Sequence, residues 1–379
     1  MPVRIAVPKE TAAGETRVAS IPEVTQRLRK RGLEVAVEAG AGTAAGYPDE
    51  TYRAAGATIA SDGGSVVDGA AIVVRVQPPT VDEARRLAPG TIVIATMNAS
   101  RNLDRVAALR DAKVTTFALE LLPRITRAQG MDVLSSQATV AGYRATLIGA
   151  ELCPKFLPML TTAAGTIRPA KVLILGAGVA GLMAIATAKR LGALVEAYDV
   201  RRAAGEQVRS LGAKFLELQI NAEGAGGYAR ELTDDEKKQE QEMLAKAIAD
   251  ADIVITTANV PGRKAPLLVR KETVARMHPG ACVVDLAAES GGNCELTQPG
   301  REVDVGGVRI VGPLNLPAQL PYHASAMYAR NVLAFLELLL DPKGALVTDF
   351  ADEILAASLL TRDGAVVHAP TAGLLAGAK

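Results

Sequence analysis

The sequence predicts an α/β protein made of two Rossmann-like, doubly wound lobes that are joined by two linking helices and leave a cleft between them. Short runs rich in Val, Ile and Leu alternate with helical patterns along most of the 379 residues, which is typical of parallel sheets covered on both faces. The length fits about two domains. A glycine-rich turn at residues 176–181 separates one apolar run from a helical pattern, as in the first unit of a dinucleotide-binding fold.

The first lobe is expected to comprise residues 1–134 together with 322–379. Apolar, β-branched runs predict its strands at 3–7, 33–38, 57–60, 71–76, 91–95 and 113–118. Helical patterns between them predict helices at 22–31, 51–55, 80–87 and 103–111. The strand at 71–76 is expected to end at Gln77-Pro-Pro, because proline has no backbone N–H to donate.

The second lobe is expected to comprise residues 135–321. Its predicted strands lie at 172–175, 194–198, 214–217, 253–256, 281–285 and 308–311, and a charged helix is predicted at 234–249. The segment 135–157 predicts a helix that links the lobes, and the segment 322–340 predicts a second helix that returns to the first lobe. Strand-like segments at 344–348 and 365–367 would complete the first lobe.

Composition excludes several classes of function. The net charge of +1 gives no electrostatic reason to expect a nucleic-acid partner. The three cysteines lack paired spacing, so no metal site is predicted and buried thiols in a reducing compartment are expected. No apolar stretch reaches the ~20 residues that span a bilayer. The first residues resemble a strand rather than a signal peptide.

The glycine turn carries the first chemical prediction. It opens a helix, so backbone N–H groups at the helix N-terminus can hold a pyrophosphate; the alternative is a purely structural turn. Asp199 follows the next strand, where its carboxylate can accept hydrogen bonds from ribose hydroxyls and would repel a 2′-phosphate. NAD(H) is therefore favoured over NADP(H). Arg201 and Arg202 could receive a 2′-phosphate, but they could equally lie in a solvated turn.

A polar segment at the junction of the lobes brings together Arg124, Arg127, Gln129, Asp132 and Ser135. Two interpretations stay open. Asp132 or Ser135 could simply cap the N-terminus of the following helix. Alternatively, the arginine, amide and carboxylate groups could line the cleft and orient a nicotinamide. A glycine-rich insertion at 219–230 is likewise either a structureless connection or a mobile functional flap.

Several motifs occur in order along nearly the whole chain: Val7-Pro-Lys-Glu, Gly14-Glu-Thr-Arg-Val-Ala, Pro123-Arg-Ile-Thr-Arg-Ala-Gln-Gly-Met-Asp, Ala141-Gly-Tyr-Arg-Ala, Thr162-Ala-Ala-Gly-Thr, Gly176-Ala-Gly-Val-Ala-Gly, Gly226-Gly-Tyr-Ala, Asp285-Leu-Ala and Gly291-Gly-Asn-Cys. Together they resemble the NAD(H)-binding α subunit of proton-translocating NAD(P) transhydrogenase. The Arg-x-x-Arg-Ala-Gln-x-x-Asp segment is distinctive of that family within a superfamily that also contains alanine dehydrogenase.

The resemblance implies roles for individual residues. Residues around the glycine turn and after two strands would bind NAD(H): Gly176, Gly178, Val179, Ala180, Gly181, Asp199, Val200, Arg201, Thr257 and Ala258. Arg124, Asp132 and Ser135 would fix the nicotinamide end, and Gln129 would contact the nicotinamide-side ribose and face a second nucleotide. Tyr228 would lie on a loop that closes over the nucleotide; the alternative is a surface tyrosine in a flexible loop.

The same resemblance implies the reaction and the partners. NADH on this chain would give a hydride directly to NADP⁺ held by a partner subunit, in the Si-side specific type of transhydrogenase. Membrane-embedded partner subunits would couple the step to proton translocation. The chain would be the split form of the α subunit, a homodimer in the cytoplasm that is held peripherally on the inner face of the cell membrane by its partners.

Alanine dehydrogenase is the main alternative function. That family uses an arginine for the substrate carboxylate, a lysine, and a histidine as acid and base; the resemblance aligns Arg17, Arg75 and Met97 with these positions. Arginine stays protonated and methionine cannot transfer a proton, whereas oxidative deamination needs a general base. Direct hydride transfer between two nicotinamides needs none. A nucleotide-sensing module without catalysis is a further alternative.

Overall fold

The computed structural model describes residues 2–217, 234–259, 264–341 and 343–377. The chain divides into two compact units, each of which is described by itself. Unit 1 contains Met1–Gln137 and Pro317–Lys379, and unit 2 contains Ala138–Leu316. The domain boundaries expected at 134/135 and 321/322 stay predictions.

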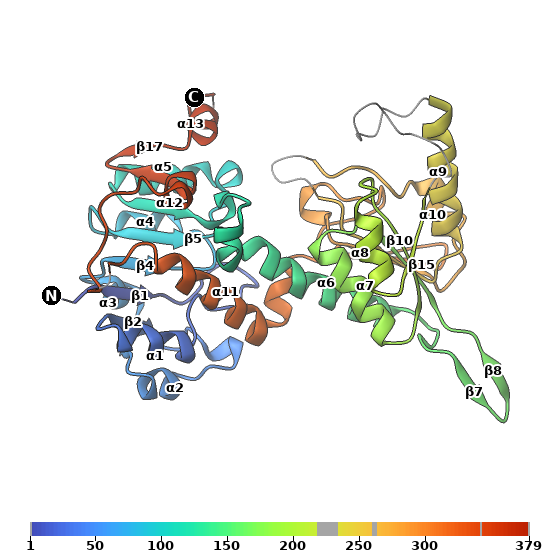
Figure 1. The fold of residues 1–379 in the computed structure, drawn as a ribbon, viewed down its shortest axis with the longest axis horizontal. Coiled ribbons are helices and arrows are strands. Elements are labelled where there is room, and N and C mark those ends of the chain that lie inside the picture. The colour runs from blue at the N-terminus through green and yellow to red at the C-terminus, as the bar shows by residue number, and fades with distance from the viewer. Residues whose placement is uncertain (1, 218–233, 260–263, 342, 378–379) are drawn as a thin grey trace. The chain divides into compact units, whose positions relative to one another are not determined.

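Unit 1 is built on an eight-stranded sheet with the order β17-β16-β6-β5-β4-β1-β2-β3 (Figure 1). Its first six strands are parallel, as predicted: β1 (Arg4–Val7), β2 (Glu34–Glu38), β3 (Thr58–Ala60), β4 (Ile72–Val74), β5 (Ile92–Ala95) and β6 (Thr115–Ala118). The order 3-2-1-4-5-6 is that of a Rossmann fold, in which the chain restarts beside β1 when it reaches β4.

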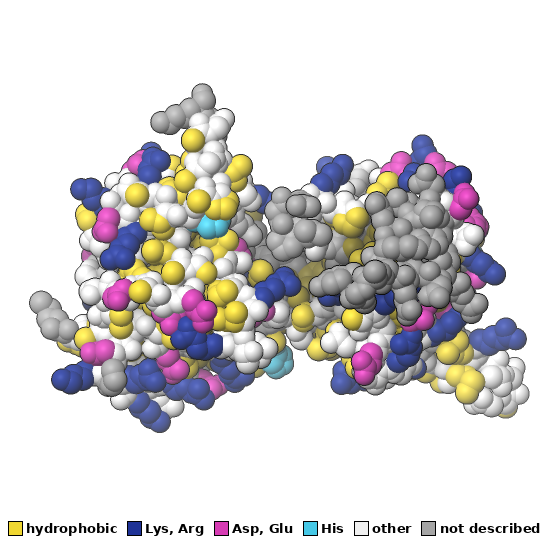
Figure 2. Space-filling model, turned by 45° about the horizontal axis from the view of Figure 1, so that its top comes forward, with side chains coloured by type: hydrophobic (Ala, Val, Ile, Leu, Met, Phe, Trp, Pro, Cys, Tyr) yellow, Lys and Arg dark blue, Asp and Glu magenta, His cyan; other side chains and the backbone are white. Residues whose placement is uncertain are grey.

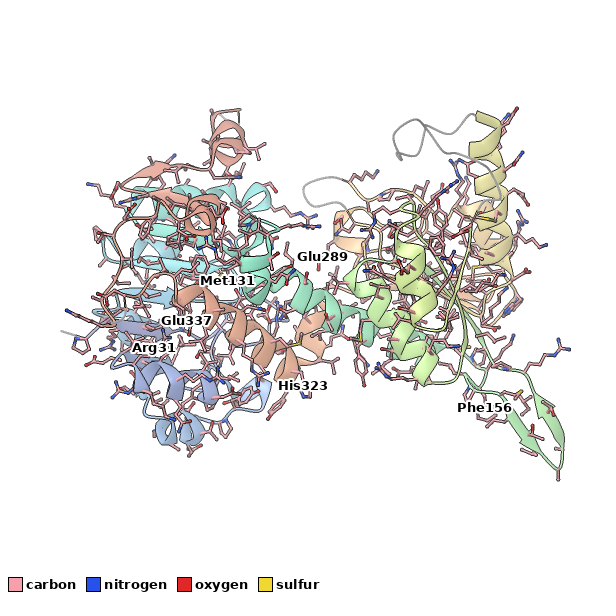
Figure 3. All side chains as sticks on the ribbon, viewed as in Figure 1. Arg31, Met131, Phe156, Glu289, His323 and Glu337 are labelled. Atoms are coloured by element: carbon pink, nitrogen blue, oxygen red, sulfur yellow. The ribbon has the colours of Figure 1, made fainter. Side chains whose placement is uncertain are left out.

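Helices cover both faces of this sheet because alternate residues of each buried strand point to opposite sides. Ile5 and Val7 pack in one apolar cluster and Ala6 in the other. The first cluster takes in α1 (Pro22–Lys30), α2 (Asp49–Ala54) and α11 (Pro321–Leu336), and the second takes in α3 (Gly63–Val67), α4 (Val81–Arg85) and α5 (Leu103–Asp111). Arg31 and Glu337, labelled in Figure 3, form an ion pair of 3.0 Å between the ends of α1 and α11.

The C-terminal part of unit 1 differs from the prediction. Residues 344–348 form no strand and make only an isolated bridge between Leu340 and Leu346, so that prediction was wrong. The strand predicted at 365–367 is present as β17 (Ala365–Val366). It pairs antiparallel with β16 (Leu359–Arg362), which was not predicted and follows α12 (Glu353–Ser358). The final helix, α13 (Ala369–Gly377), exposes apolar side chains such as Leu374.

Unit 2 holds a seven-stranded sheet with the order β11-β10-β9-β12-β13-β15-β14. Five neighbouring pairs are parallel and the pair of β14 and β15 is antiparallel. The strands are β9 (Lys171–Leu175), β10 (Leu194–Tyr198), β11 (Lys214–Phe215), β12 (Ile253–Thr256), β13 (Cys282–Asp285), β14 (Glu302–Val305) and β15 (Val308–Val311), and the helices are α7 (Val179–Arg190), α8 (Ala204–Ser210), α9 (Asp234–Ala249) and α10 (Lys271–Val274). This again is the Rossmann order, with one added edge strand.

The predicted linking helix is shorter than expected. It is α6 (Val133–Leu152), and it stops before Pro154, whose missing N–H cannot continue a helix. Residues 153–170 instead form an arm of unit 2 that carries the antiparallel strands β7 (Leu160–Thr162) and β8 (Gly165–Ile167). Figure 3 labels Phe156 at the base of this arm, where 57% of its surface is exposed.

The outer surface of the protein is mixed in charge. In the view of Figure 2, Lys and Arg side chains are interspersed with Asp and Glu side chains. The three cysteines lie buried as free thiols, as expected. Of the helices within the described ranges, none has the length and apolar character needed to cross a bilayer.

Candidate dinucleotide-binding site

The carboxyl edge of the unit 2 sheet contains the switch point of its topology. β9 and β12 are neighbours there, although β10 and β11 lie between them in sequence. Ligands of doubly wound sheets bind at this place, outside the carboxyl ends of the strands. The predicted glycine turn follows β9 and the segment 257–258 follows β12, so the two meet at the switch point.

Close backbone packing explains two of the three glycines. Gly176 has a φ of 104°, a left-handed conformation that favours glycine, and a Cβ there would lie 2.6 Å from Thr257 Oγ1. A Cβ on Gly181 would lie 1.8 Å from the Gly176 carbonyl oxygen. Thr257 Oγ1 donates a hydrogen bond of 2.9 Å to that same oxygen, so helix, turn and the end of β12 are held together.

The third glycine is unlike the other two. Gly178 is the N-cap residue of α7 with extended backbone angles, and a Cβ there would meet nothing within 4 Å. As a glycine, this N-cap residue has no side chain that could cap the helix. The first N–H groups of a helix have no intrahelical acceptor, so the α7 N-terminus can donate to an anion that approaches Gly178. Val179, 42% exposed, and Ala180 lie in this first turn.

The first turn of α7 also packs closely against α6. A Cβ on Gly142 of α6 would lie 2.0 Å from the Ala180 carbonyl oxygen. Only glycine permits this approach of the two helices. Gly142 belongs to one of the motifs recognised in the sequence, but the contact depends on tertiary packing and could not be predicted.

Asp199 lies directly after β10, beside the glycine turn. Its carboxylate accepts hydrogen bonds of 2.8 Å from the backbone N–H groups of Ala177 and Arg201. The Arg201 guanidinium also pairs with it, at 3.0 Å through Nε. Burial alone would raise the pKa of this carboxyl, but the hydrogen bonds and charge of Arg201 lower it. A ribose diol that binds Asp199 would therefore have to share its carboxylate with Arg201 or displace Arg201 from it. Val200, which lies between these two residues in the sequence, is 80% exposed.

The polar cluster of unit 1 surrounds one short helical turn, η4 (Thr126–Met131), and the start of α6. Asp132 accepts hydrogen bonds from the backbone N–H of Ser135 at 2.9 Å and from its Oγ at 2.6 Å, so it caps α6 as one interpretation proposed. Arg124 and Gln129 are exposed and therefore accessible to a ligand.

The η4 turn itself is firmly held. Ala128 and Met131, the latter labelled in Figure 3, are buried in the core of unit 1. Asn331 of α11 donates a hydrogen bond of 2.8 Å to the Gly130 carbonyl oxygen. Arg127 pairs with Asp352 at 2.7 Å. Gln129 is consequently an exposed amide on a fixed support.

The carboxyl edge of the unit 1 sheet has the same topology but is filled by charged side chains. Arg75, 3% exposed, pairs with Glu83 at 3.0 Å and with Glu10 at 3.7 Å. Burial raises the pKa of Glu10 to about 7, although Arg75 and backbone N–H groups oppose the rise. Arg17 pairs with Glu15 at 2.6 Å. Burial would raise the pKa of Glu15, but the hydrogen bonds and charge of Arg17 hold it at about 2.

The other side chains considered in the sequence analysis are Met97, the histidines and Tyr228. Met97 is completely buried. His278 is 3.0 Å from Asp252, and His323, labelled in Figure 3, lies in the first turn of α11. Among the described residues, no three His, Cys, Asp or Glu side chains are grouped so as to hold a metal ion. Tyr228 lies outside the described residues.

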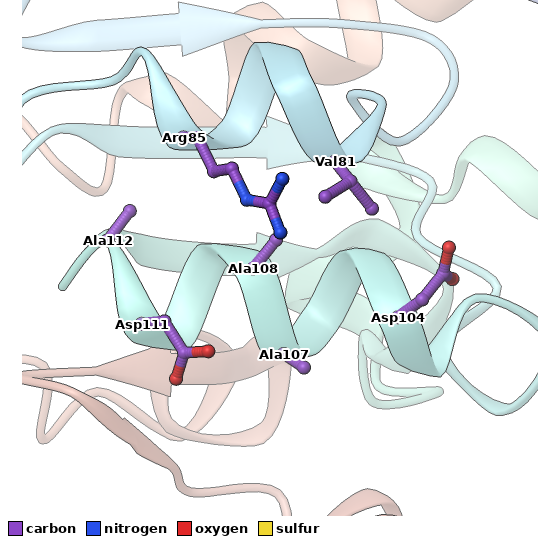
Figure 4. A pocket seen from close by; sticks show the side chains of 7 residues that line it. All are labelled: Val81, Arg85, Asp104, Ala107, Ala108, Asp111 and Ala112. Carbon is purple, nitrogen blue, oxygen red and sulfur yellow. The ribbon is translucent and has the colours of Figure 1, made fainter.

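A separate hollow of about 410 Å³ lies between α4 and α5 (Figure 4). In Figure 4 the Arg85 side chain extends from α4 toward α5, where the small side chains of Ala107 and Ala108 line the hollow. It contains none of the predicted site residues: its lining is Val81, Arg85, Asp104, Ala107, Ala108, Asp111 and Ala112. The hollow is therefore not part of the candidate site.

Comparison with known proteins decides the family. The profile of the alanine dehydrogenase/PNT N-terminal domain matches residues 6–141, and that of the alanine dehydrogenase/PNT C-terminal domain matches residues 145–369. The chain belongs to the alanine dehydrogenase/PNT family. A similar relative is a Rhodospirillum rubrum protein named as the first part of NAD(P) transhydrogenase subunit alpha, which is 46% identical over 98% of this chain and 99% of its own length.

Solved structures of the alanine dehydrogenase/PNT family agree with this fold. A transhydrogenase from Sinorhizobium meliloti superposes with a TM-score of 0.85 at 44% identity, covering 96% of this chain and 99% of that one. An L-alanine dehydrogenase superposes with a TM-score of 0.83 at 25% identity over 100% of both chains. The predicted fold class and the family resemblance are thus confirmed.

Proposed function

We propose that this chain is the NAD(H)-binding α component of a proton-translocating NAD(P) transhydrogenase of the Si-side specific type. The main structural support for this proposal is a difference between the switch points of the two sheets. At the switch point of unit 2, a glycine with open space beside it is the N-cap residue of a helix, whereas the switch point of unit 1 is filled by its own ion pairs. The likeness to transhydrogenase subunits over the full length supports the same assignment.

In this proposal the chain binds and orients NADH. Backbone N–H groups of the α7 N-terminus hold the pyrophosphate where Gly178 leaves room, and Asp199 accepts from the adenosine ribose. The further contacts come from Val179, Ala180, Val200, Arg201, Thr257 and Ala258. Bound NADH supplies the hydride. The protein contributes position, orientation and exclusion of water.

The nicotinamide end is assigned to the polar cluster of unit 1. Arg124, Asp132 and Ser135 fix this end of the cofactor, and Gln129 contacts the nicotinamide-side ribose. Two of these four side chains are exposed and Asp132 already orients Ser135, so the cluster is accessible and ordered. Tyr228 is assigned to the loop that closes over the nucleotide.

The acceptor and the coupling belong to other subunits. A partner subunit holds NADP(H) opposite the NADH of this chain, and membrane-embedded subunits couple transfer to proton translocation. The chain works as a homodimer, placed by its partners on the inner face of the cell membrane. The proposed step needs no acid or base from this chain, because the hydride passes directly between two nicotinamides; Met97, which aligns with the histidine of alanine dehydrogenases, has no group that could accept a proton.

Titration of the isolated chain tests the cofactor assignment. NADH is expected to bind about tenfold or more tightly than NADPH, because a 2′-phosphate would lie against the Asp199 carboxylate. NADH fluorescence or calorimetry measures both affinities. Addition of NAD⁺ and L-alanine should give no NADH absorbance.

Asp199→Asn is the matched variant, since it removes the charge and keeps the shape. This variant should reduce the difference between the affinity for NADH and the affinity for NADPH. Equal affinity of the wild-type chain for NADH and NADPH would contradict the assignment. Steady oxidation of alanine would instead favour an amino-acid dehydrogenase.

A further inference from the structure

Asn293 is a completely buried amide in the loop after β13 of unit 2. Its Nδ2 donates two hydrogen bonds of 2.8 Å, one to the Ala258 carbonyl oxygen and one to that of Pro266. Its backbone carbonyl oxygen accepts from the backbone N–H groups of Leu268 and Val269, at 2.8 and 3.0 Å. A buried amide with this many backbone partners fixes the positions of all of them.

The orientation of Asn293 is set by Asp285 at the end of β13. This carboxylate is fully buried, and its Oδ2 accepts from the backbone N–H groups of Asn293 and Cys294 at 2.8 and 3.0 Å. Thr297 Oγ1 donates a third hydrogen bond of 2.6 Å to the same atom. Since a buried charge needs such donors, the turn that carries Asn293 is built around Asp285.

Asn293 is linked to the glycine turn through Ala258. Ala258 follows Thr257, whose Oγ1 donates to the Gly176 carbonyl oxygen at 2.9 Å. A Cβ on Gly176 would lie 3.2 Å from the Ala258 N atom. The segment 257–258 is thus closely packed against the glycine turn. A shift of Ala258 would therefore also displace the backbone of the candidate pyrophosphate site.

We propose that Asn293 is a positioning residue for NADH binding: through its forked Nδ2 contacts it holds Ala258 and Thr257 against the glycine turn before the cofactor arrives. Asn293 does not touch NADH, because it is entirely covered by protein. The inference rests on the proposed function, since it assigns NADH to this site. Pre-ordering of a binding segment improves affinity by removing the entropy cost of ordering it on binding.

Asn293→Leu tests the proposal, because it removes both donors and keeps a side chain of similar size. The affinity of the whole chain for NADH is expected to fall about tenfold, because the two hydrogen bonds that Nδ2 donates to Ala258 and Pro266 are lost. Cys282→Ala is the control: it removes a fully buried side chain from the core of unit 2, at the end of β13 opposite to Asp285, and leaves the Nδ2 contacts intact. Both variants should unfold at lower temperature, and only Asn293→Leu should bind NADH more weakly.

Asn293→Asp gives a readout that a merely structural role would not move. The introduced carboxyl faces two carbonyl oxygens, and it can donate to one of them only when protonated. Its NADH affinity relative to wild type at the same pH should therefore recover as the pH falls. Asn293→Ser, which keeps one donor, replaces Asn293→Leu in the comparison if that variant does not fold.

Two results would overturn the proposal. One is unchanged NADH affinity in the folded Asn293 variants. The other is an equal loss of affinity in Cys282→Ala, which would mean that Asn293 only stabilises unit 2. A wild-type chain that does not bind NADH would instead contradict the proposed function, so the two failures can be told apart.

Discussion

Gln129→Asn should slow hydride transfer to NADP⁺ about 100-fold while leaving NADH affinity within about twofold. The shorter side chain draws the amide back by about 1.5 Å, one C–C bond, and errors of about 1 Å at a reacting centre have effects of this size. The support of the amide stays in place, because η4 is held by Asn331 and by the buried side chains of Ala128 and Met131. Single-turnover transfer with the NADP(H)-binding partner and NADH titration measure the two quantities.

Gln298→Asn makes the same chemical change at an exposed glutamine outside the predicted site, and it should alter neither quantity. Equal losses of transfer and of NADH affinity in Gln129→Asn would show that Gln129 contributes to binding as such. Full activity of the variant would remove Gln129 from the reacting centre.

Gly178→Ala should lower the stability of the chain by no more than about 1 kcal/mol, because alanine is a poorer N-cap residue than glycine, and it should weaken NADH binding about 10- to 100-fold. The added methyl group meets nothing within 4 Å, and the backbone of Gly178, with a φ of −78°, is open to any residue. The methyl group would therefore collide only with a ligand. Overpacking of one methyl group costs about 1–3 kcal/mol, which corresponds to the expected loss of affinity.

Two glycine variants serve as controls for Gly178→Ala. Gly373→Ala, on α13, also meets nothing within 4 Å; it should not lower stability, because alanine favours a helix interior over glycine, and it should not change binding. Gly181→Ala would place a Cβ 1.8 Å from the Gly176 carbonyl oxygen and should lower the unfolding temperature itself. Wild-type NADH affinity in Gly178→Ala would mean that no pyrophosphate lies against this turn.

Local sequence patterns were sufficient to predict much of the candidate dinucleotide site. The glycine turn, α7 and the strand that precedes Asp199 follow from residue spacing alone, because each depends on backbone geometry within a few neighbouring residues. The helix predicted at 103–111 coincides with α5, and the charged helix predicted at 234–249 coincides with α9. That these residues bind NAD(H) stays a prediction.

Long-range pairing and tertiary contacts could not be predicted in this way. β16 pairs antiparallel with β6 across more than 200 residues, and no local pattern indicates that partner. The segment 344–348 looked like a strand by composition, yet it is not paired into the sheet. Asn293 belonged to a recognised motif, but its role depends on carbonyl groups that only the folded chain brings to it.

Isotope tracing tests the central claim of direct hydride transfer most directly. The chain, combined with its NADP(H)-binding partner, is given NADH that carries deuterium at the transferred position of C4, in ordinary water. We expect the deuterium to appear quantitatively at C4 of NADPH, because no residue of this chain relays a proton to or from the transferred hydrogen. Loss of the label to water, or NADPH that gains deuterium from heavy water when unlabelled NADH is used, would contradict the account.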